Sequence, residues 1–259
     1  MSTKAKIAAI LAGVLVLAGC NALTDRQRML LADGEGAYRD KQYDSAVQHL
    51  STFLDEVHDR PEVARALYVR GMARAQSGKR AWGQADLEQA ARQATDPQLL
   101  WQPHAALGTL YFEDENWEAA ARAFNQAIEH MPAAPPQDAL LFRLGLCCER
   151  LGRWSAALAP YRRIVAQFPS GVYAEGAERR AQLAADHFAV QCGMFASMEN
   201  ANDLVAQLRK QSLRAYVRAE PRKGNTYYVV LEGRYNSYRE ANQALARVRG
   251  YVPQAVLWP

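Results

Sequence analysis

The chain has 259 residues, which is enough for about two domains of ordinary size. Hydrophobic residues make up 49% and charged residues 22%, a composition that excludes a chain disordered throughout and allows ordinary buried cores. The net charge of +4 is modest, but residues 187–259 carry ten Lys and Arg against five Asp and Glu, so basic character collects at the C-terminus and suits an acidic or polyanionic partner.

Residues 1–19 have the pattern of a secretory signal peptide. Lys4 and Lys6 form a basic segment, residues 7–18 are apolar and uncharged, and small residues precede Cys20. The apolar run is shorter than the roughly 20 residues that a transmembrane helix needs. A plain signal peptide or a short anchor helix is the alternative to a lipoprotein signal peptide.

The ending Leu-Ala-Gly-Cys20 resembles the lipobox of bacterial lipoproteins. The resemblance implies that the peptide before Cys20 is removed and that its thiol is acylated, with palmitate as a typical chain. Residues 20–26 would then form a lipidated N-terminus and linker, anchored on the periplasmic side of the envelope. An Asp at the next position would indicate retention at the inner membrane; Asn21 therefore favours the outer membrane.

Residues 27–186 contain an internal repeat with a period of 37. A glycine starts each pattern, a small residue follows 12 positions later, and a large apolar residue follows 16 positions later. We expect four helix–turn–helix units in which the two small residues let the helices approach closely. A last helix would cap the array within residues 173–186. The glycines are Gly34, Gly71, Gly108 and Gly145, the small residues are Ala46, Gly83, Ala120 and Ala157, and the large residues are Leu50, Leu87, Phe124 and Tyr161.

The third and fourth copies resemble the tetratricopeptide (TPR) repeat, and each ends in a proline, Pro132 and Pro169. The first two copies are degenerate, because Asp33 and Arg70 replace the Leu before the Gly. The resemblance implies an all-α TPR solenoid that binds an unidentified protein or peptide in a concave groove. The alternative is an array that serves only as a spacer.

Residues 187–259 change to a mixed pattern. Strands are expected near residues 187–192, 213–219, 227–232 and 255–258, with helices over 200–211 and after Ser237, where Ser-Tyr-Arg-Glu forms a capping box. The order βαββαβ predicts a small α+β ferredoxin-like domain, so the chain as a whole is multidomain. Gly193 and Phe195 recur 40 residues later as Gly233 and Tyr235, as two βαβ halves would require.

The segments Val190-Gln-Cys-Gly-Met-Phe195 and Tyr228-Val-Val-Leu-Glu-Gly-Arg-Tyr235 resemble the two halves of a SPOR domain. This resemblance implies binding to peptidoglycan glycan strands that have lost their stem peptides, as found at division septa. Met194 and Val229 depart from the family, which often has Ser and sometimes Arg at these positions. A structural domain that no longer binds glycan is the alternative.

Strand alternation predicts which residues lie on the face of the sheet away from the helices. Aromatic rings there would stack on sugars, the Gln amide would pair with an N-acetyl group, and the Arg residues would bind lactyl carboxylates. On this basis we expect an open face with an exposed aromatic patch. The predicted glycan-binding residues are Gln191, Arg214, Tyr216, Arg218 and Tyr227. Glu232 points to the helix side by the same alternation, and a strand end or a bulge would explain it.

No pattern in the sequence indicates catalysis, a metal site or a cofactor. The five His are scattered, and no phosphate loop, nucleophile elbow or His-Glu-x-x-His is present. Cys192 is expected to be a buried free thiol, and Cys147 and Cys148 core residues rather than a disulfide. We expect no enzyme activity and no nucleic-acid partner.

Two functions remain open from the sequence. The first is an envelope lipoprotein that binds septal glycan with its SPOR domain and protein partners with its repeats, in cell division or wall remodelling. The second is a TPR adaptor lipoprotein for outer-membrane or pilus protein assembly, in which the SPOR domain is auxiliary. Aromatic and Gln residues on one sheet face favour the first function.

Overall fold

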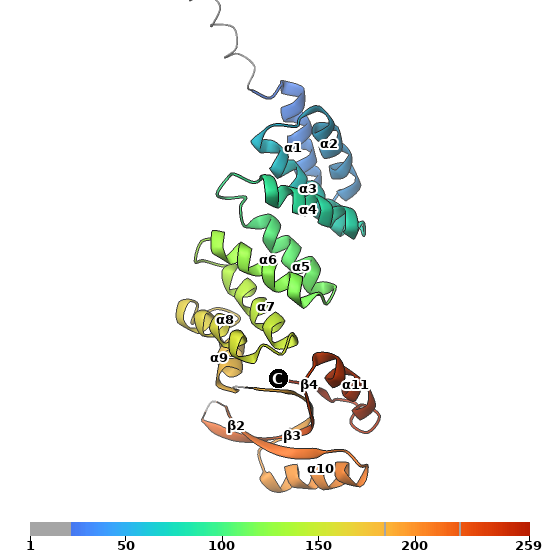
Figure 1. Ribbon diagram of the computed structural model, residues 1–259, viewed down its shortest axis with the longest axis vertical. Helices are drawn as coiled ribbons and strands as arrows, with labels where there is room; N and C mark the ends of the chain where they lie inside the picture. The colour runs from blue at the N-terminus through green and yellow to red at the C-terminus, as the bar shows by residue number, and fades with distance from the viewer. Residues whose placement is uncertain (1–21, 184, 223) are drawn as a thin grey trace, which may run out of the picture. The chain divides into compact units, whose positions relative to one another are not determined.

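The computed structural model describes residues 22–259 except 184 and 223. The predicted signal peptide and Cys20 therefore lie outside the described residues. Paired helices come first and a small α+β domain follows (Figure 1). The helices of the first part are α1 (Asp25–Arg39), α2 (Tyr43–Glu56), α3 (Pro61–Gln76), α4 (Arg80–Gln93), α5 (Gln102–Glu113), α6 (Trp117–His130), α7 (Gln137–Arg150), α8 (Trp154–Gln167) and α9 (Ala174–Leu183).

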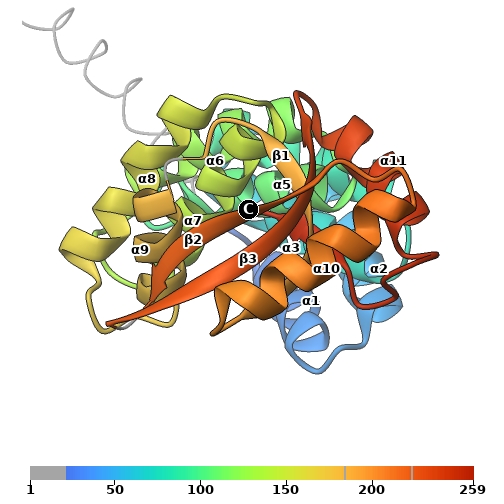
Figure 2. The ribbon, with the colours of Figure 1, turned by 90° about the horizontal axis from the view of Figure 1, so that it is seen from below.

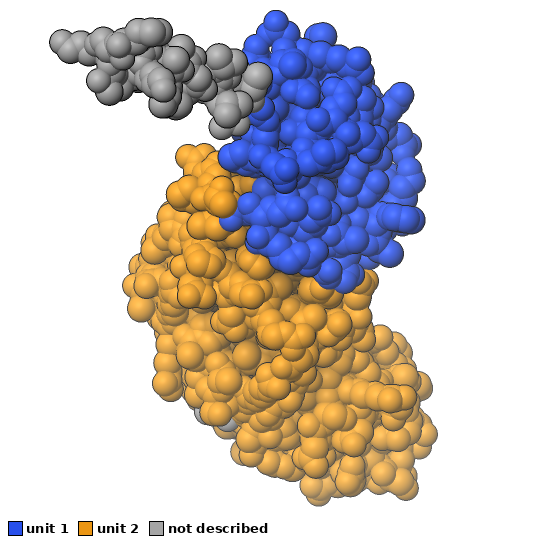
Figure 3. Space-filling model, turned by 45° about the horizontal axis from the view of Figure 1, so that its top comes forward, with its two compact units in different colours: residues 1–94 blue, residues 95–259 orange. Residues whose placement is uncertain are grey.

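The chain forms two compact units, residues 1–94 and residues 95–259 (Figure 3). The first unit contains α1–α4. The second contains α5–α9 together with the whole α+β domain, so the last helix pairs and that domain form one body.

The predicted helix–turn–helix repeat is confirmed by the helix boundaries. The second helices of the pairs, α2, α4, α6 and α8, begin at Tyr43, Arg80, Trp117 and Trp154, each 37 residues after the one before. Asn116 caps α6 by accepting a hydrogen bond from the backbone N–H of Ala119. The repeat length is thus set by paired helices joined by tight turns.

The regularly spaced glycines mark the places where the two helices of a pair touch. A methyl group at Gly108 would lie 2.5 Å from Cδ1 of Phe124, and one at Gly34 would lie 2.5 Å from Cγ of Leu50. At Gly71 the nearest atoms include the carbonyl oxygen of Gly83, at 2.9 Å, so two backbones meet there. The large residue of each repeat therefore occupies the space that the absent side chain leaves.

The first unit also holds a buried charge cluster in its second helix pair. Asp86 on α4 accepts two hydrogen bonds from Arg70, at 2.9 and 2.8 Å, and one from Arg74, at 2.7 Å. Its side chain is 6% exposed. Arg70, which replaces the Leu expected before Gly71, is therefore bound by a partner on the neighbouring helix.

The α+β domain has the predicted βαββαβ order. Its four strands form one antiparallel sheet in the order β2-β3-β1-β4. Figure 2 shows the long β2–β3 pair with helix α10 beside it. The elements are β1 (Phe188–Phe195), α10 (Met198–Lys210), β2 (Ala215–Arg222), β3 (Asn225–Tyr235), α11 (Tyr238–Val248) and β4 (Val256–Trp258).

Serine caps position both helices of this domain. Ser237, predicted to start a helix, accepts a hydrogen bond from the backbone N–H of Glu240, and Ser197 accepts one from Glu199. Each cap satisfies an N–H group that has no partner within the helix. The two caps stand 40 residues apart, at equivalent points of the two halves.

Aromatic contacts join the helical part of the second unit to the α+β domain. The ring of Trp154 on α8 lies 4.6 Å from that of Phe188 on β1, and Trp117 on α6 lies 5.9 Å from Tyr238 on α11. The guanidinium of Arg150 lies over the Tyr238 ring at 3.8 Å. These contacts explain why the domain is not a separate compact unit.

Candidate functional site

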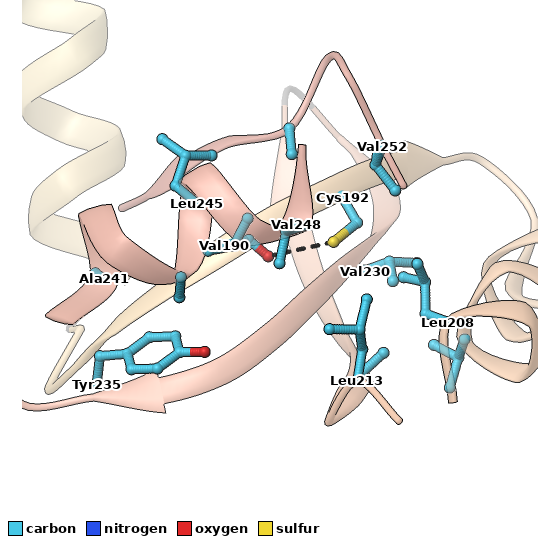
Figure 4. Close-up of a cluster of buried hydrophobic side chains, with 14 of the residues drawn as sticks. Val190, Cys192, Leu208, Leu213, Val230, Tyr235, Ala241, Leu245, Val248 and Val252 are labelled. Atoms are coloured by element: carbon cyan, nitrogen blue, oxygen red, sulfur yellow. Dashed lines mark hydrogen bonds between the residues drawn. The ribbon is translucent and has the colours of Figure 1, made fainter. Parts of the chain in front are cut away.

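The helix-facing side of the sheet forms the core of the α+β domain. Val190, Cys192 and Val230 pack with Val205, Leu208, Leu245 and Val248 of the two helices (Figure 4). Strand alternation therefore assigned this face correctly. Buried Glu232 also points to it, and its carboxylate accepts a hydrogen bond of 2.7 Å from the hydroxyl of Tyr235.

A bulge resolves the position of Glu232, as the sequence suggested. Gly233, the next residue, has a φ of +72°, which glycine adopts without strain. The strand then continues with Arg234 exposed and Tyr235 buried. The bulge brings the Tyr235 hydroxyl to the buried carboxylate, and without such a donor this carboxylate would be costly to bury.

The opposite face of the sheet, expected to be open, is closed in its middle. Ala189, Val229, Leu231 and Trp258 are at most 1% exposed, and Leu183 at the end of α9 packs on them. Apolar surface from the capping helix α9 thus covers apolar surface of the sheet, which removes both from water. The expectation of an exposed aromatic patch over the whole face is wrong.

Two of the predicted site residues hold this cover in place. The hydroxyl of Tyr216 and Nε2 of His187 are joined by a hydrogen bond of 2.9 Å. Arg218 donates to the carbonyl oxygen of Leu183 at 2.7 Å, and its guanidinium lies 4.8 Å from the ring centre of Trp258. Both side chains are half-buried and tie the segment after α9 to the sheet.

The other three predicted residues lie in different places. Half-buried Gln191 pairs with Leu231 and Val256 in the sheet. Tyr227 pairs with Glu220 at the end of β2 near the β2–β3 turn. Exposed Arg214 lies at the other end of β2, just before its first residue. Its guanidinium lies over the ring of Tyr235, which belongs to the helix-facing core. The structure therefore does not gather the five residues into one row, and Arg214 stands apart.

A buried carboxylate beneath this face was not anticipated from the sequence. Glu220 is 2% exposed, and it accepts hydrogen bonds of 2.8 Å from the indole N–H of Trp258 and from Arg222. It joins β2 to the C-terminal strand across 38 positions of sequence. The only local signal is an acidic residue within a strand that otherwise alternates, and this signal does not identify the partners.

A groove lies between α9 and the turn end of β2 and β3. Its volume is about 880 Å³. Val172 and Arg179 line it from the helical side, and Met194, Arg222 and Tyr227 from the sheet. Of the predicted glycan-binding residues, Tyr227 lines this groove.

The three cysteines among the described residues are free thiols, and Cys147 and Cys192 are buried. Burial raises the pKa of both Cys147 and Cys192 to about 12, so neither is a thiolate near neutral pH. Cys147, Cys148 and Cys192 are free, as predicted. The Cys192 thiol points to the carbonyl oxygen of Val190 at 3.7 Å (Figure 4). None of the three has the lowered pKa of a nucleophilic cysteine.

The described part of the chain lacks a metal-binding cluster and a membrane-spanning helix. No three His, Cys, Asp or Glu side chains within residues 22–183, 185–222 and 224–259 are grouped as a metal ion would need. No helix in the same residues is both long and apolar enough to cross a membrane.

Comparison with solved structures supports the helical fold. MamA 41-end from Desulfovibrio magneticus RS-1 superimposes over 73% of this chain and 99% of its own, with a TM-score of 0.51 and 14% identity. A crystal structure of MamA protein superimposes over 62% of this chain and 82% of its own, with a TM-score of 0.50 and 17% identity. At these identities the likeness concerns the fold alone.

Comparison with protein families divides the chain into two parts. Residues 105–172 match the tetratricopeptide repeat, and residues 184–257 match the SPOR domain. No curated protein matches the sequence. The first match covers the third copy of the repeat, which carries the full pattern, and the fourth, which matches it almost as well, and both families are binding modules. The chain therefore carries tetratricopeptide repeats followed by a SPOR domain.

Proposed function

We propose that this protein is a non-catalytic envelope lipoprotein whose SPOR domain binds peptidoglycan glycan strands and whose repeats bind a protein partner. The match of residues 184–257 to the SPOR domain carries the proposal. The groove beside Tyr227 supports it, because it offers an aromatic ring and one guanidinium group from the sheet and a second guanidinium group from α9. Denuded strands at division septa are the proposed target.

Binding to cell-wall sacculi tests this function. The full chain is used, because Trp154 and Leu183 of the helical part pack on the SPOR domain. We expect co-sedimentation to increase after an amidase has removed the stem peptides. Tyr227→Ala should weaken binding about fivefold to tenfold, the loss expected for one stacking aromatic group.

Tyr251→Ala is the matched control. Tyr251 is 53% exposed and follows α11, away from the groove, so the same truncation there should leave sedimentation unchanged. If the wild-type protein stays in the supernatant with both kinds of sacculi, the glycan-binding function is wrong, and the repeats become the place to look for a partner.

The proposed membrane anchor rests on the Leu-Ala-Gly-Cys20 motif. We expect cells supplied with labelled palmitate to incorporate the label into the wild-type protein and not into a Cys20→Ala variant, because the thiol is the site of acylation. The variant should also leave the membrane fraction, since acyl chains contribute roughly 0.8 kcal/mol per buried methylene. Label retained in the variant would exclude Cys20 as the lipidated residue.

A further inference from the structure

The groove beside the SPOR sheet has a wall that does not belong to the SPOR domain. Val172 and Arg179 come from the segment before α9 and from α9 itself, whereas Met194, Arg222 and Tyr227 come from β1, β2 and β3. Helix α9 is fixed there by the burial of Leu183 and by the hydrogen bond from Arg218 to the Leu183 carbonyl. The capping helix α9 and the sheet therefore form one surface.

One guanidinium group in this groove has hydrogen-bond donors left over. Arg179 makes no hydrogen bond or ion pair with any residue that the structure describes. Burial, together with the neighbouring guanidinium groups of Arg180 and Arg222, lowers its pKa, whereas the carboxylates of Glu220 and Glu149 act in the opposite direction. Arg222 donates to Glu220, and its Nε–H is buried and out of reach of a ligand in the groove. A bound carboxylate is the group that would satisfy the donors of Arg179.

The other residues that line the groove provide apolar, aromatic and hydrogen-bond-accepting groups that a sugar chain can contact. Val172 is 92% exposed and Met194 is 41% exposed, so both present apolar surface to the solvent, and Tyr227 adds an aromatic ring. The carboxylate of Glu178 accepts one hydrogen bond from Gln182 and has further acceptor capacity for sugar hydroxyls. Apolar contacts, acceptors and an unsatisfied guanidinium group together fit a saccharide that carries a carboxylate.

We propose that α9 forms one wall of the glycan site and that Arg179 binds the lactyl carboxylate which becomes free when a stem peptide is removed. This inference rests on the proposed function and makes it more specific. It assigns the preference for denuded glycan to a residue of the helical part, outside residues 184–257 that match the SPOR domain. The helix that caps the repeats would then contribute directly to wall recognition.

The test compares Arg179→Gln with Arg162→Gln in the full chain. Both variants lose one positive charge. Arg162 is exposed on α8 and does not line the groove, so its replacement is the control. Binding to amidase-treated sacculi should be about tenfold weaker for Arg179→Gln, as expected for one charge-assisted hydrogen bond, and unchanged for Arg162→Gln. Thermal unfolding of both variants verifies that the fold is intact.

A chemical change in the ligand completes the test. Carbodiimide and ammonia convert the lactyl carboxylates of denuded sacculi to amides. Wild-type binding should then fall to the level of Arg179→Gln, while binding of this variant should hardly change. An equal loss for both proteins would overturn the pairing of Arg179 with the carboxylate.

The outcomes separate this inference from the function on which it rests. If Arg179→Gln binds denuded sacculi as the wild type does while Tyr227→Ala does not, the α9 wall is refuted and glycan binding stands. If the wild-type protein does not sediment with denuded sacculi, both proposals are wrong.

Discussion

Trp258→Ala should destabilise the second compact unit by about 4 kcal/mol or more. The indole is 1% exposed, and truncation of a fully buried Trp typically costs about 3–5 kcal/mol. The same change removes the N–H that donates to buried Glu220 at 2.8 Å, leaving that carboxylate with Arg222 alone. A residue next to the end of the chain is therefore expected to be among the most important for stability.

Two further variants separate the causes of this loss. Trp258→Phe keeps a ring but removes the donor, and we expect it to cost about 1–3 kcal/mol. Val256→Ala, in the same strand but 46% exposed, should cost less than about 1 kcal/mol. Urea unfolding followed by circular dichroism gives the free energies. Hydrogen exchange should show that α9 loses protection, because Leu183 packs on the indole. Equal urea midpoints for Trp258→Ala and the wild type would contradict the buried position of this side chain.

Asp86→Ala should destabilise the first compact unit by about 3–5 kcal/mol. Asp86 is the common acceptor for Arg70 and Arg74, whose side chains are 14% and 18% exposed. Burial and the neighbouring Arg70 lower the pKa of Arg74, whereas Asp86 raises it. Removal of the carboxylate leaves two guanidinium groups close together with little access to water, which is the costly way to break a buried ion pair.

The control for this variant is another acid of the same unit. Asp44 pairs with Lys79 at 2.9 Å, but the two side chains are 82% and 52% exposed, so Asp44→Ala should cost less than about 1 kcal/mol. Adding Arg70→Met to Asp86→Ala should restore part of the stability, because one unpaired charge is replaced by an apolar chain. Hydrogen exchange in α3 and α4 measures both effects. Similar losses for Asp86→Ala and Asp44→Ala would show that the cluster is not effectively buried.

Local patterns predicted most of the architecture. The helix pairs follow from the spacing of Gly108, Phe124 and their equivalents, because a helix contact without a side chain on one partner leaves room for a large one on the other. The two faces of the sheet follow from strand alternation, because successive side chains point to opposite sides. Even the inward direction of Glu232 followed from this rule, although its Tyr235 partner did not.

The accessibility of the sheet could not be predicted in this way. Tyr216 and Arg218 lie on the expected face, yet they contact His187 and Leu183 rather than an open surface. Alternation states which side of a strand a residue occupies, but it does not state what covers that side. The covering residues are far away in the sequence: His187 lies 29 positions from Tyr216, and Leu183 lies 35 positions from Arg218. A pattern that extends over a few residues cannot predict such contacts.

The order of the helices and strands, the close contacts within each repeat and the membership of each sheet face can be predicted from sequence, because they depend on periodicity within a few residues. Three features required the folded structure: α9 closes the middle of the SPOR sheet, Trp258 and Glu220 join its two edge strands, and Arg179 and Tyr227 line the same groove. These contacts join segments that are far apart in the sequence. The hydrophobic effect that brings such segments together is non-directional, so a local sequence pattern does not indicate which of them pack against each other.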